Sequence, residues 1–297
     1  MEEKLLNPPP RRSLFRIGCM IMILIPAALF LLMMGVSLLG NFSMSVSKKV
    51  AVVPVNGVIS DSEQLLEHLR RYGKDNSVKA VVLRINSPGG GVAPSQEIYE
   101  EVRRLDAKKP VLTSMGSIAA SGGYYIASGS RKIYANPGTM TGSIGVVMPF
   151  VNMKDLVDRI GIKGMAVKSG EFKDTGSPLR EMTPEEREVL QSVVDNVHMQ
   201  FVNAVAQGRK LPPEDVMGIA DGRIFTGEQA KALGLVDELG ALDDAVREAA
   251  LLGGISGEPR VITPPKAKVS LLNLIREEVR SMIHGTTDGG IIPLQLN

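Results

Sequence analysis

The chain has 297 residues, of which 44% are hydrophobic, so it is long enough for one large domain or two small ones with an ample core. Its formal net charge is only +2, which gives no reason to expect a nucleic-acid partner. The three histidines, at positions 68, 198 and 284, do not pair at the spacing of metal ligands. The sequence therefore predicts no metal, no cofactor and no Ser-His-Asp triad.

Residues 17–39 form an apolar segment without a single charge. A helix of this length, rising about 1.5 Å per residue, spans the roughly 30 Å hydrocarbon core of a bilayer, so we expect one transmembrane anchor. A cleaved signal peptide is the alternative. Its apolar core is usually only about 7–15 residues long, and no Ala-x-Ala site follows here, so an uncleaved anchor is favoured.

The charges around this segment indicate its orientation. Arg11, Arg12 and Arg16 lie directly before it, whereas Lys48 and Lys49 follow only after a polar stretch and weaken the bias. Because the larger positive cluster is N-terminal, we expect a single-pass protein of the cell membrane with a cytoplasmic N-terminus and the bulk of the chain outside.

The chain divides into five predicted parts. These are a cytoplasmic tail at residues 1–16, the anchor at 17–39, a linker at 40–48, a catalytic domain at 49–252 and a flexible C-terminal segment at 253–297. In the last part, residues 269–283 are amphipathic and residues 285–297 are glycine-rich with an apolar end. We expect residues 285–297 to occupy the enzyme's own substrate groove. The alternative is that they have no such role and that residues 269–283 form a helix packed on the membrane or on a neighbouring subunit.

Within the catalytic domain, short β-branched runs alternate with amphipathic stretches. Strands are predicted at residues 50–59, 80–86, 111–115, 133–135, 142–147 and 164–168. Helices are predicted at residues 63–72, 95–105, from about 122, 154–160, 183–207, 213–220, 227–233 and 243–251, and the long one opens on the capping box Thr183-Pro-Glu-Glu186. This alternation predicts an α/β fold whose parallel sheet is covered by flanking helices.

The chemistry centres on Met115-Gly-Ser-Ile-Ala-Ala-Ser121-Gly-Gly-Tyr-Tyr-Ile126, which follows a predicted strand. A serine among small residues, in a chain poor in histidine, indicates a serine hydrolase that uses a lysine base, and such a lysine must lose its charge to work. The alternative is a strand-to-helix turn with a capping serine. The residues alone do not separate Ser121 from Ser117 or Ser87 as the nucleophile.

Two further loops supply glycines and hydroxyls, and a third supplies lysines. Asn86-Ser-Pro-Gly-Gly-Gly91 follows a strand and can direct backbone N–H groups at a ligand, although a plain connecting loop has the same composition. Thr141-Gly-Ser143-Ile-Gly145 adds another hydroxyl. The segment Lys168-Ser-Gly-Glu-Phe-Lys173-Asp174 offers two lysines, and the residues alone do not choose between them.

Together with Ala220-Asp-Gly-Arg-Ile-Phe-Thr-Gly-Glu-Gln-Ala230 and Gly234-Leu-Val-Asp-Glu-Leu-Gly240, these motifs resemble the signal peptide peptidase A family, whose fold is related to Clp protease and crotonase. The resemblance runs from about residue 50 to residue 250, and the order of the motifs is highly specific. It implies a Ser-Lys peptidase of the short, single-domain form, built as a ring-shaped homo-oligomer.

The resemblance also implies a role for individual residues. Ser121 is the implied nucleophile, Lys173 the general base, and Ser143 the residue that orients the lysine. Gly90 and Gly122 are the implied oxyanion-hole donors, with Gly89 and Gly91 as near alternatives. Whether the serine and lysine of one site come from one subunit or from neighbours stays open.

Three functions are compatible with these residues. The first is a membrane-anchored endopeptidase that hydrolyses cleaved signal peptides and other apolar peptides. The second is a broader quality-control protease for envelope or membrane proteins. The third, a non-catalytic membrane scaffold, is disfavoured because both Ser121 and Lys173 are present.

Overall fold

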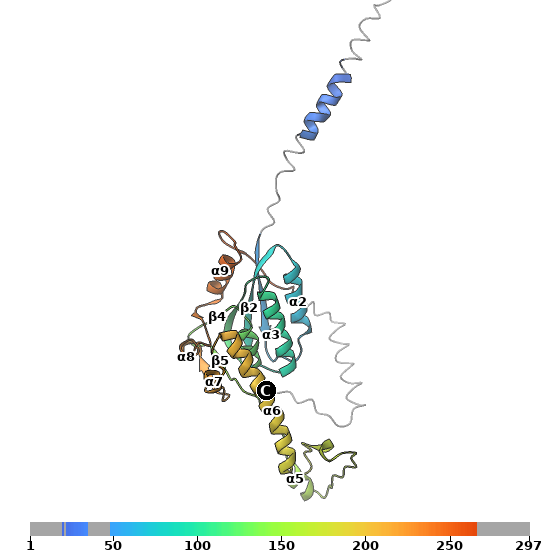
Figure 1. The fold of residues 1–297 in the computed structure, drawn as a ribbon. Helices are drawn as coiled ribbons and strands as arrows, with labels where there is room; N and C mark the ends of the chain where they lie inside the picture. The colour runs from blue at the N-terminus through green and yellow to red at the C-terminus, as the bar shows by residue number, and fades with distance from the viewer. Residues whose placement is uncertain (1–19, 21, 35–47, 266–297) are drawn as a thin grey trace, which may run out of the picture. The chain divides into compact units, whose positions relative to one another are not determined.

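The computed structural model describes residue 20, residues 22–34 and residues 48–265, which belong to two separate units, residues 1–47 and residues 48–297 (Figure 1). In the first unit, residues 22–34 are helical. Among the described residues, no helix has the length and apolar character needed to cross a membrane. The predicted anchor at residues 17–39 extends beyond the described residues on both sides, as do residues 269–283 and 285–297 of the predicted C-terminal segment.

The second unit is built on a mixed sheet whose main path has the order β6-β5-β3-β2-β1-β8, with β4 pairing both β3 and β7. All pairs are parallel except β5 with β6. The strands are β1 (Lys49–Asn56), β2 (Val78–Ser87), β3 (Val111–Ala120), β4 (Lys132–Ala135), β5 (Met140–Gly142), β6 (Ile224–Thr226), β7 (Glu238–Leu239) and β8 (Arg260–Ile262).

Strand β3 changes partner halfway along its length. Its first half pairs with β4 and its second half with β5, while β2 follows it on the other side. Between the pairs Ile85↔Met115 and Ser87↔Ala119, β2 has one residue and β3 has three, so β3 is bulged. Asn86 lies opposite the bulge and accepts a hydrogen bond from the N–H of Ile118 at 3.3 Å. The bulge sets the register of the end of β3, so that Ala119 lies opposite Ser87 and residue 121 follows directly after the strand.

Helices cover both faces of the sheet. The larger core packs α2 (Glu63–Lys74), α3 (Val92–Asp106), α4 (Gly122–Ser128), α6 (Pro184–Arg209) and α7 (Pro213–Met217) against one face, and α8 (Gly227–Ala232) contributes Ala230 to it. The smaller core packs α9 (Leu242–Leu252) against the other face. The α/β architecture with flanking helices predicted from the sequence is therefore confirmed.

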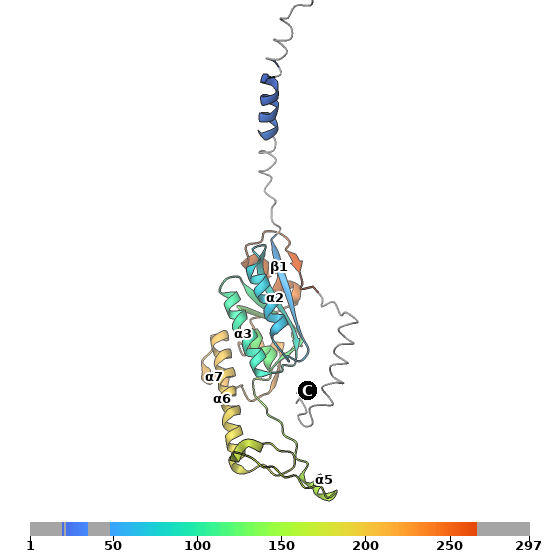
Figure 2. The ribbon, with the colours of Figure 1, turned by 90° about the vertical axis from the view of Figure 1, so that its right-hand side faces the viewer.

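A projecting lobe, residues 148–195, extends from this body (Figures 1 and 2). It contains α5 (Lys154–Arg159), the short helix η1 (Glu171–Asp174) and the N-terminal half of α6. Both views show α5 at the end of the lobe that is remote from the sheet. The helix α6 joins lobe and body, because its last turns carry buried core residues such as Phe201 and Val205.

Most predicted elements are present, with boundaries that differ by a few residues, but two predictions are wrong. Residues 164–168 are not a strand: Met165 and Val167 are 93% and 101% exposed, and within residues 48–265 no strand pairs with them. The strand predicted at residues 142–147 is instead β5, which ends at Gly142.

Three short strands, β6, β7 and β8, were not predicted. The last of these lies within the segment that the sequence analysis assigned to a flexible C-terminus, and it pairs with β1 in parallel. Strands of two or three residues are too short to produce a recognisable alternation, so their position is set by the sheet that receives them.

Candidate active site

Ser121 lies in a strained turn between β3 and α4. Its backbone has φ 51° and ψ −122°, a conformation that a residue with a Cβ rarely adopts and that costs on the order of 1–3 kcal/mol. Two hydrogen bonds hold the turn: the N–H of Ser121 donates to the carbonyl of Gly142 at 2.9 Å, and its carbonyl accepts from Tyr125 at 2.8 Å. The rest of the fold therefore enforces an unusual backbone at the predicted nucleophile.

The two alternative serines have different environments. Ser87 is fully buried, and its hydroxyl accepts the N–H of Gly89 at 3.1 Å. Ser117 is exposed on the bulge of β3 and is not part of the cavity that contains Ser121. Of the three, only Ser121 combines a strained backbone with a position in a cavity.

The glycine loop after β2 lies against Ser121, and hydrogen bonds distinguish its three glycines. The N–H of Gly89 donates to Ser87, and the N–H of Gly91 donates to the carbonyl of Ile59 at 2.8 Å. Within the described part of the chain, the N–H of Gly90 has no acceptor. Because the loop leaves this one donor unused, Gly90 is better placed than its neighbours to bind an oxyanion.

Gly90 and Gly122 are close together. A Cβ built on Gly122 would lie 3.3 Å from the backbone nitrogen of Gly90 and only 2.4 Å from Oγ of Ser95. Gly90 itself has φ 155°, and a Cβ there would lie 2.3 Å from the carbonyl oxygen of Ile59. Side chains are therefore excluded from both positions, and the two backbone segments approach each other beside Ser121.

Ser143 completes this group from the neighbouring strand β5. Its backbone is also left-handed, with φ 50°, and its N–H donates to the carbonyl of Arg223 at 2.8 Å. Since β5 pairs with the end of β3, the residue after β5 lies beside the residue after β3. Ser143 and Ser121 consequently line the same cavity.

This cavity has a volume of about 400 Å³ and one apolar side. Its polar lining is made by Ser95, Ser121, Ser143, Asp221 and the backbone of Gly90 and Gly122. Its apolar side consists of Val92, Tyr125, Val146, Val147, Val197 and Phe201. The ring centroids of Tyr125 and Phe201 on that side are 4.7 Å apart.

The two tyrosines after Ser121 have different roles in the structure. Tyr124 is fully buried and donates a hydrogen bond to the carbonyl of Leu235 at 2.9 Å, and burial raises the pKa of its hydroxyl. Tyr125 lines the cavity and stacks edge-on against Tyr99. Both tyrosines are buried in the core, and Tyr125 also lines the cavity.

The structure does not bring Lys173 to this cavity. Lys173 is exposed in η1, and the neighbouring Asp174 is tied through Arg180 to Glu186 at the start of α6. The cavity instead contacts α6 at Val197. Glu186 and Val197 are eleven residues apart on α6, or roughly 17 Å at 1.5 Å per residue. This distance is greater than the reach of a lysine side chain.

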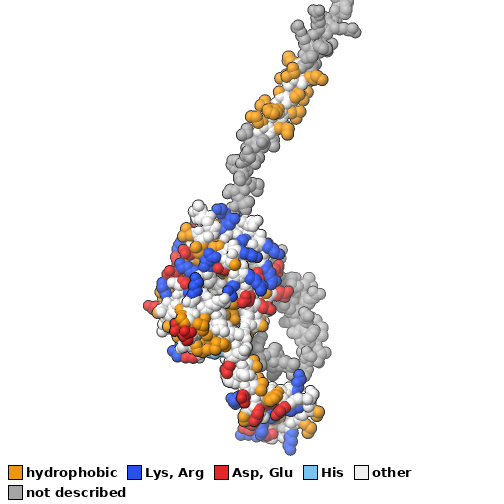
Figure 3. All heavy atoms as spheres, in the orientation of Figure 1, with side chains coloured by type: hydrophobic (Ala, Val, Ile, Leu, Met, Phe, Trp, Pro, Cys, Tyr) orange, Lys and Arg blue, Asp and Glu red, His pale blue; other side chains and the backbone are white. Residues whose placement is uncertain are grey.

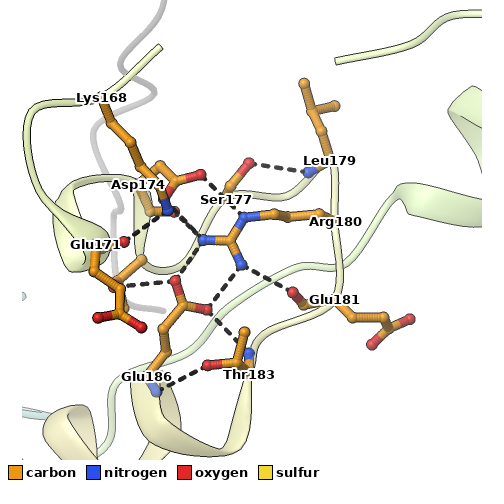
Figure 4. Close-up of polar contacts among 10 residues, drawn as sticks. Lys168, Glu171, Asp174, Ser177, Leu179, Arg180, Glu181, Thr183 and Glu186 are labelled. Atoms are coloured by element: carbon orange, nitrogen blue, oxygen red, sulfur yellow. Dashed lines mark hydrogen bonds and ion pairs between the residues drawn. The ribbon is translucent and has the colours of Figure 1, made fainter. Parts of the chain in front are cut away.

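Polar contacts distinguish Lys168, which Figure 4 shows, from Lys173. The ammonium of Lys168 donates at 2.6 Å to both the Asp174 carboxylate and the carbonyl of Glu171. In residues 48–265, the ammonium of Lys173 has no ion-pair partner. These contacts hold the ammonium of Lys168 against its own lobe, so Lys173 is the freer of the two to reach another site.

Arg180 is the centre of this network. It binds Asp174 on one side and the buried carboxylate of Glu186, only 3% exposed, on the other. The hydrogen bonds from Arg180 lower the pKa of Asp174, and together with the N–H of Thr183 they lower the pKa of Glu186 to about 2. Asp174 therefore has a structural role, because its ion pair with Arg180 ties the 3-10 helix η1 to the start of α6.

Sequence reasoning missed Arg180, Ser95 and the two α6 residues of the cavity wall. Thr183 and Glu186 do form the predicted capping box, but nothing in the sequence marked Arg180 as the partner of Glu186. Among the described residues, no group of three or more His, Cys, Asp or Glu side chains is arranged to hold a metal ion.

Comparisons with known proteins add a family context. The profile of peptidase family S49 matches residues 103–256, and that of Clp protease matches residues 45–141. A Synechocystis sp. protein named as a candidate protease is 45% identical over 72% of this chain and 78% of its own length. A candidate signal peptide peptidase SppA of Enterococcus faecium is 40% identical over 67% of this chain and 62% of its own length. Protease 4 of Salmonella typhi is 39% identical over 68% of this chain, which spans 34% of that longer protein.

Proposed function

Since the chain belongs to peptidase family S49 and is therefore a serine peptidase, we propose that it is a membrane-anchored endopeptidase in which Ser121 is the nucleophile and Lys173 the general base. The observation that carries the assignment is the strained turn at Ser121, beside the unused N–H of Gly90 and the hydroxyl of Ser143. These are the groups that acyl transfer to a serine needs, apart from the base.

The reaction proceeds in two steps. A neutral lysine takes the proton from the Ser121 hydroxyl, whose oxygen attacks the scissile carbonyl, and the N–H groups of Gly90 and Gly122 bind the developing oxyanion. The lysine then gives its proton to the leaving amine, and an acyl-enzyme remains. Water that loses a proton to the same lysine hydrolyses this ester. One such oxyanion donor contributes about 3–4 kcal/mol to lowering the barrier.

The lysine of each site comes from a neighbouring subunit of a ring-shaped homo-oligomer. Within one chain Lys173, in η1 beside the start of α6, lies too far from Ser121 to reach it, whereas its exposed position on a projecting lobe suits insertion into the cavity of another copy. The lobe also exposes apolar side chains that a neighbour would cover: Phe150, Val151, Leu156, Ile160, Ile162, Met165, Val167 and Phe172.

The substrates are cleaved signal peptides and other apolar peptides. The support is the apolar side of the cavity, where Tyr125 and Phe201 would contact a substrate side chain without offering it a charge. A broader quality-control protease is the second candidate, since the same wall would accept apolar segments of unfolded membrane proteins. Peptidomics of membranes with and without the active protein separates the two: accumulated signal-peptide fragments favour the first, and accumulated full-length membrane proteins favour the second.

The anchor at residues 17–39 holds the protein in the cell membrane, with the catalytic domain outside the cytoplasm. This proposal rests on the length and apolar character of that segment. Extraction of membranes at alkaline pH tests it, because an integral protein stays in the pellet. External protease should then degrade the domain in cells whose outer barrier is opened, while cytoplasmic proteins stay intact.

Labelling with a serine-reactive fluorophosphonate tests the enzyme assignment itself. The wild-type chain should be labelled at Ser121, and Ser121→Ala should lose both the label and peptide hydrolysis. The matched control is Ser117→Ala, a change on the same strand but outside the cavity, which should keep both. Labelling that survives Ser121→Ala would assign the nucleophile elsewhere, and a folded oligomer that neither labels nor cleaves would favour the scaffold reading.

A further inference from the structure

One edge of the catalytic unit is strongly basic. The parallel strands β1, β2 and β3 begin at this edge, and the helices α2 and α3, which run back along them, end there. Basic residues occur at each of these places, so the fold gathers charges that are dispersed in the sequence. We call this set the basic edge: Lys48, Lys49, Arg70, Arg71, Lys74, Lys79, Arg103, Arg104, Lys108 and Lys109.

Contacts confirm that these residues are neighbours. The ammonium of Lys109, before β3, donates to the carbonyls of Tyr72 and Asp75 at the end of α2, at 2.8 and 2.6 Å. Burial lowers the pKa of Lys109, and the nearby charge of Lys79 lowers it further, opposed by that of Asp75. Figure 3 shows Lys and Arg side chains gathered on the same half of the body.

The positive charge of this edge is not balanced locally. Its nearby acidic residues include Asp75, Glu101, Asp106 and Glu258, fewer than the ten basic ones; Glu101 lies between Arg70 and Arg104, and Asp106 pairs with Arg131. The whole chain has 34 basic and 32 acidic residues, so the excess at this edge is offset elsewhere. Like charges held together in this way repel each other, and a negatively charged surface relieves the repulsion.

The active-site cavity lies at the opposite edge. Ser121 follows the carboxyl end of β3, and Gly90 follows that of β2. The chain enters the unit at the basic edge, through Lys48. The nine linker residues 40–48 reach at most about 30 Å when fully extended, so a chain anchored by residues 17–39 keeps this edge within that distance of the bilayer.

From these observations we infer that the basic edge binds anionic lipid headgroups of the membrane that anchors the protein, so that the cavity with Ser121 opens away from the bilayer. The inference rests on the proposed anchoring and goes beyond it, because an anchor alone leaves the domain free to turn. It also concerns the substrate: an apolar peptide must leave the membrane surface before it reaches Ser121. Binding of this kind weakens as salt is added.

Lysine acetylation of the full chain in lipid nanodiscs tests the inference. Discs of phosphatidylcholine alone are compared with discs that also contain phosphatidylglycerol, and mass spectrometry follows Lys74 and Lys108 as reporters and Lys163, exposed on the lobe, as the internal reference. In the anionic discs, acetylation of both reporters should slow at least threefold relative to Lys163. High salt should restore their rates.

A charge variant and its control complete the test. Replacing Arg70, Arg71 and Arg104 by Gln removes charge from the edge while keeping the reporters, and should abolish the lipid dependence. The matched control replaces Arg159, Arg187 and Arg247, which lie on the lobe and on α9, and should keep it.

Three results would overturn the inference, and each has a different consequence for the proposed anchor or for the ligand of the basic edge. Equal reporter rates in both kinds of disc would contradict lipid binding while leaving the anchor intact. Protein that does not associate with discs at all would contradict the anchor as well. Protection of the reporters by soluble polyphosphate but not by phosphatidylglycerol would assign the edge to an anionic polymer instead of a lipid surface.

Discussion

Arg180 binds the buried carboxylate of Glu186, and the same guanidinium also binds Asp174, the residue that follows Lys173. The start of α6 and the turn that carries the proposed base are therefore held by one side chain. The Arg180 guanidinium connects residues from three successive segments of the lobe, which otherwise has little buried apolar surface of its own. This relationship determines where Lys173 is presented.

Replacing Arg180 by Gln should lower kcat at least tenfold with little change in KM. The turn loses its charged contacts and Lys173 its fixed position, whereas the cavity that binds the peptide is made by other residues. Arg180→Lys should recover part of the rate, because one ammonium can bind one of the two carboxylates. Arg187→Gln, which removes the same charge from the nearby first turns of α6, is the control. Equal kcat values for Arg180→Gln and this control would show that the network does not position the base.

The lobe should also loosen in acid before the body does. Because Arg180 lowers the pKa of Glu186 from 4.5 to about 2, the ionised carboxylate stabilises the folded lobe above about pH 4.5, and this contribution is lost as the pH falls towards 2. Hydrogen exchange of residues 168–190, compared between pH 6 and pH 3, measures the effect. Protection should decrease there and persist in β2 and β3. Glu186→Gln should abolish the difference, and unchanged exchange in the wild type would contradict the assignment.

Lys173→Arg should be as inactive as Lys173→Ala. Arginine keeps the positive charge and similar length, but it does not lose its proton in a protein and so cannot accept one from Ser121. The chain offers a matched control in Lys168→Arg, which preserves the ion pair with Asp174 and should stay active. Peptide turnover is measured on oligomers whose size is checked. More than a few per cent of wild-type activity in folded Lys173→Arg would mean that another residue is the base.

Ser143→Ala should reduce kcat roughly 10-fold to 100-fold, the effect of losing one hydrogen bond to a charged partner, and should leave KM nearly unchanged. The hydroxyl lies in the cavity of Ser121, where it can hold an incoming lysine. Thr141→Ser is a useful control, since its hydroxyl keeps the bond to the carbonyl of Ala119 and does not face the cavity. A wild-type rate for Ser143→Ala would remove Ser143 from the mechanism.

The sequence predicts the central sheet and most helices because each element carries its own periodic signal and its own cap. Thr183 and Glu186, for example, form the expected capping box at the start of α6. The segment at 164–168 is likewise a short apolar run before a lysine, yet it is not a strand, because Met165 and Val167 have no sheet to join. Local pattern does not reveal whether a partner strand is available.

The candidate site shows a similar limit. Ser121, Gly90 and Ser143 follow strands that pair with one another, so a parallel sheet already implies that they converge. The choice of Gly90 over Gly89 and Gly91 depends on which N–H groups Ser87 and Ile59 occupy, and only three-dimensional contacts provide that information. The separation of Lys173 from the cavity likewise follows from the length of α6 outside the body.

The central claim is that Ser121 of one subunit works with Lys173 of its neighbour, and mixing two inactive variants tests it most directly. Ser121→Ala and Lys173→Ala proteins are dissociated, mixed in equal amounts and reassembled, and mixed oligomers are verified by native mass spectrometry. In a random ring, about a quarter of the sites then pair an intact serine with an intact lysine, so peptide turnover should recover to about a quarter of the wild-type rate. Verified mixed oligomers that stay inactive would contradict a dyad shared between subunits.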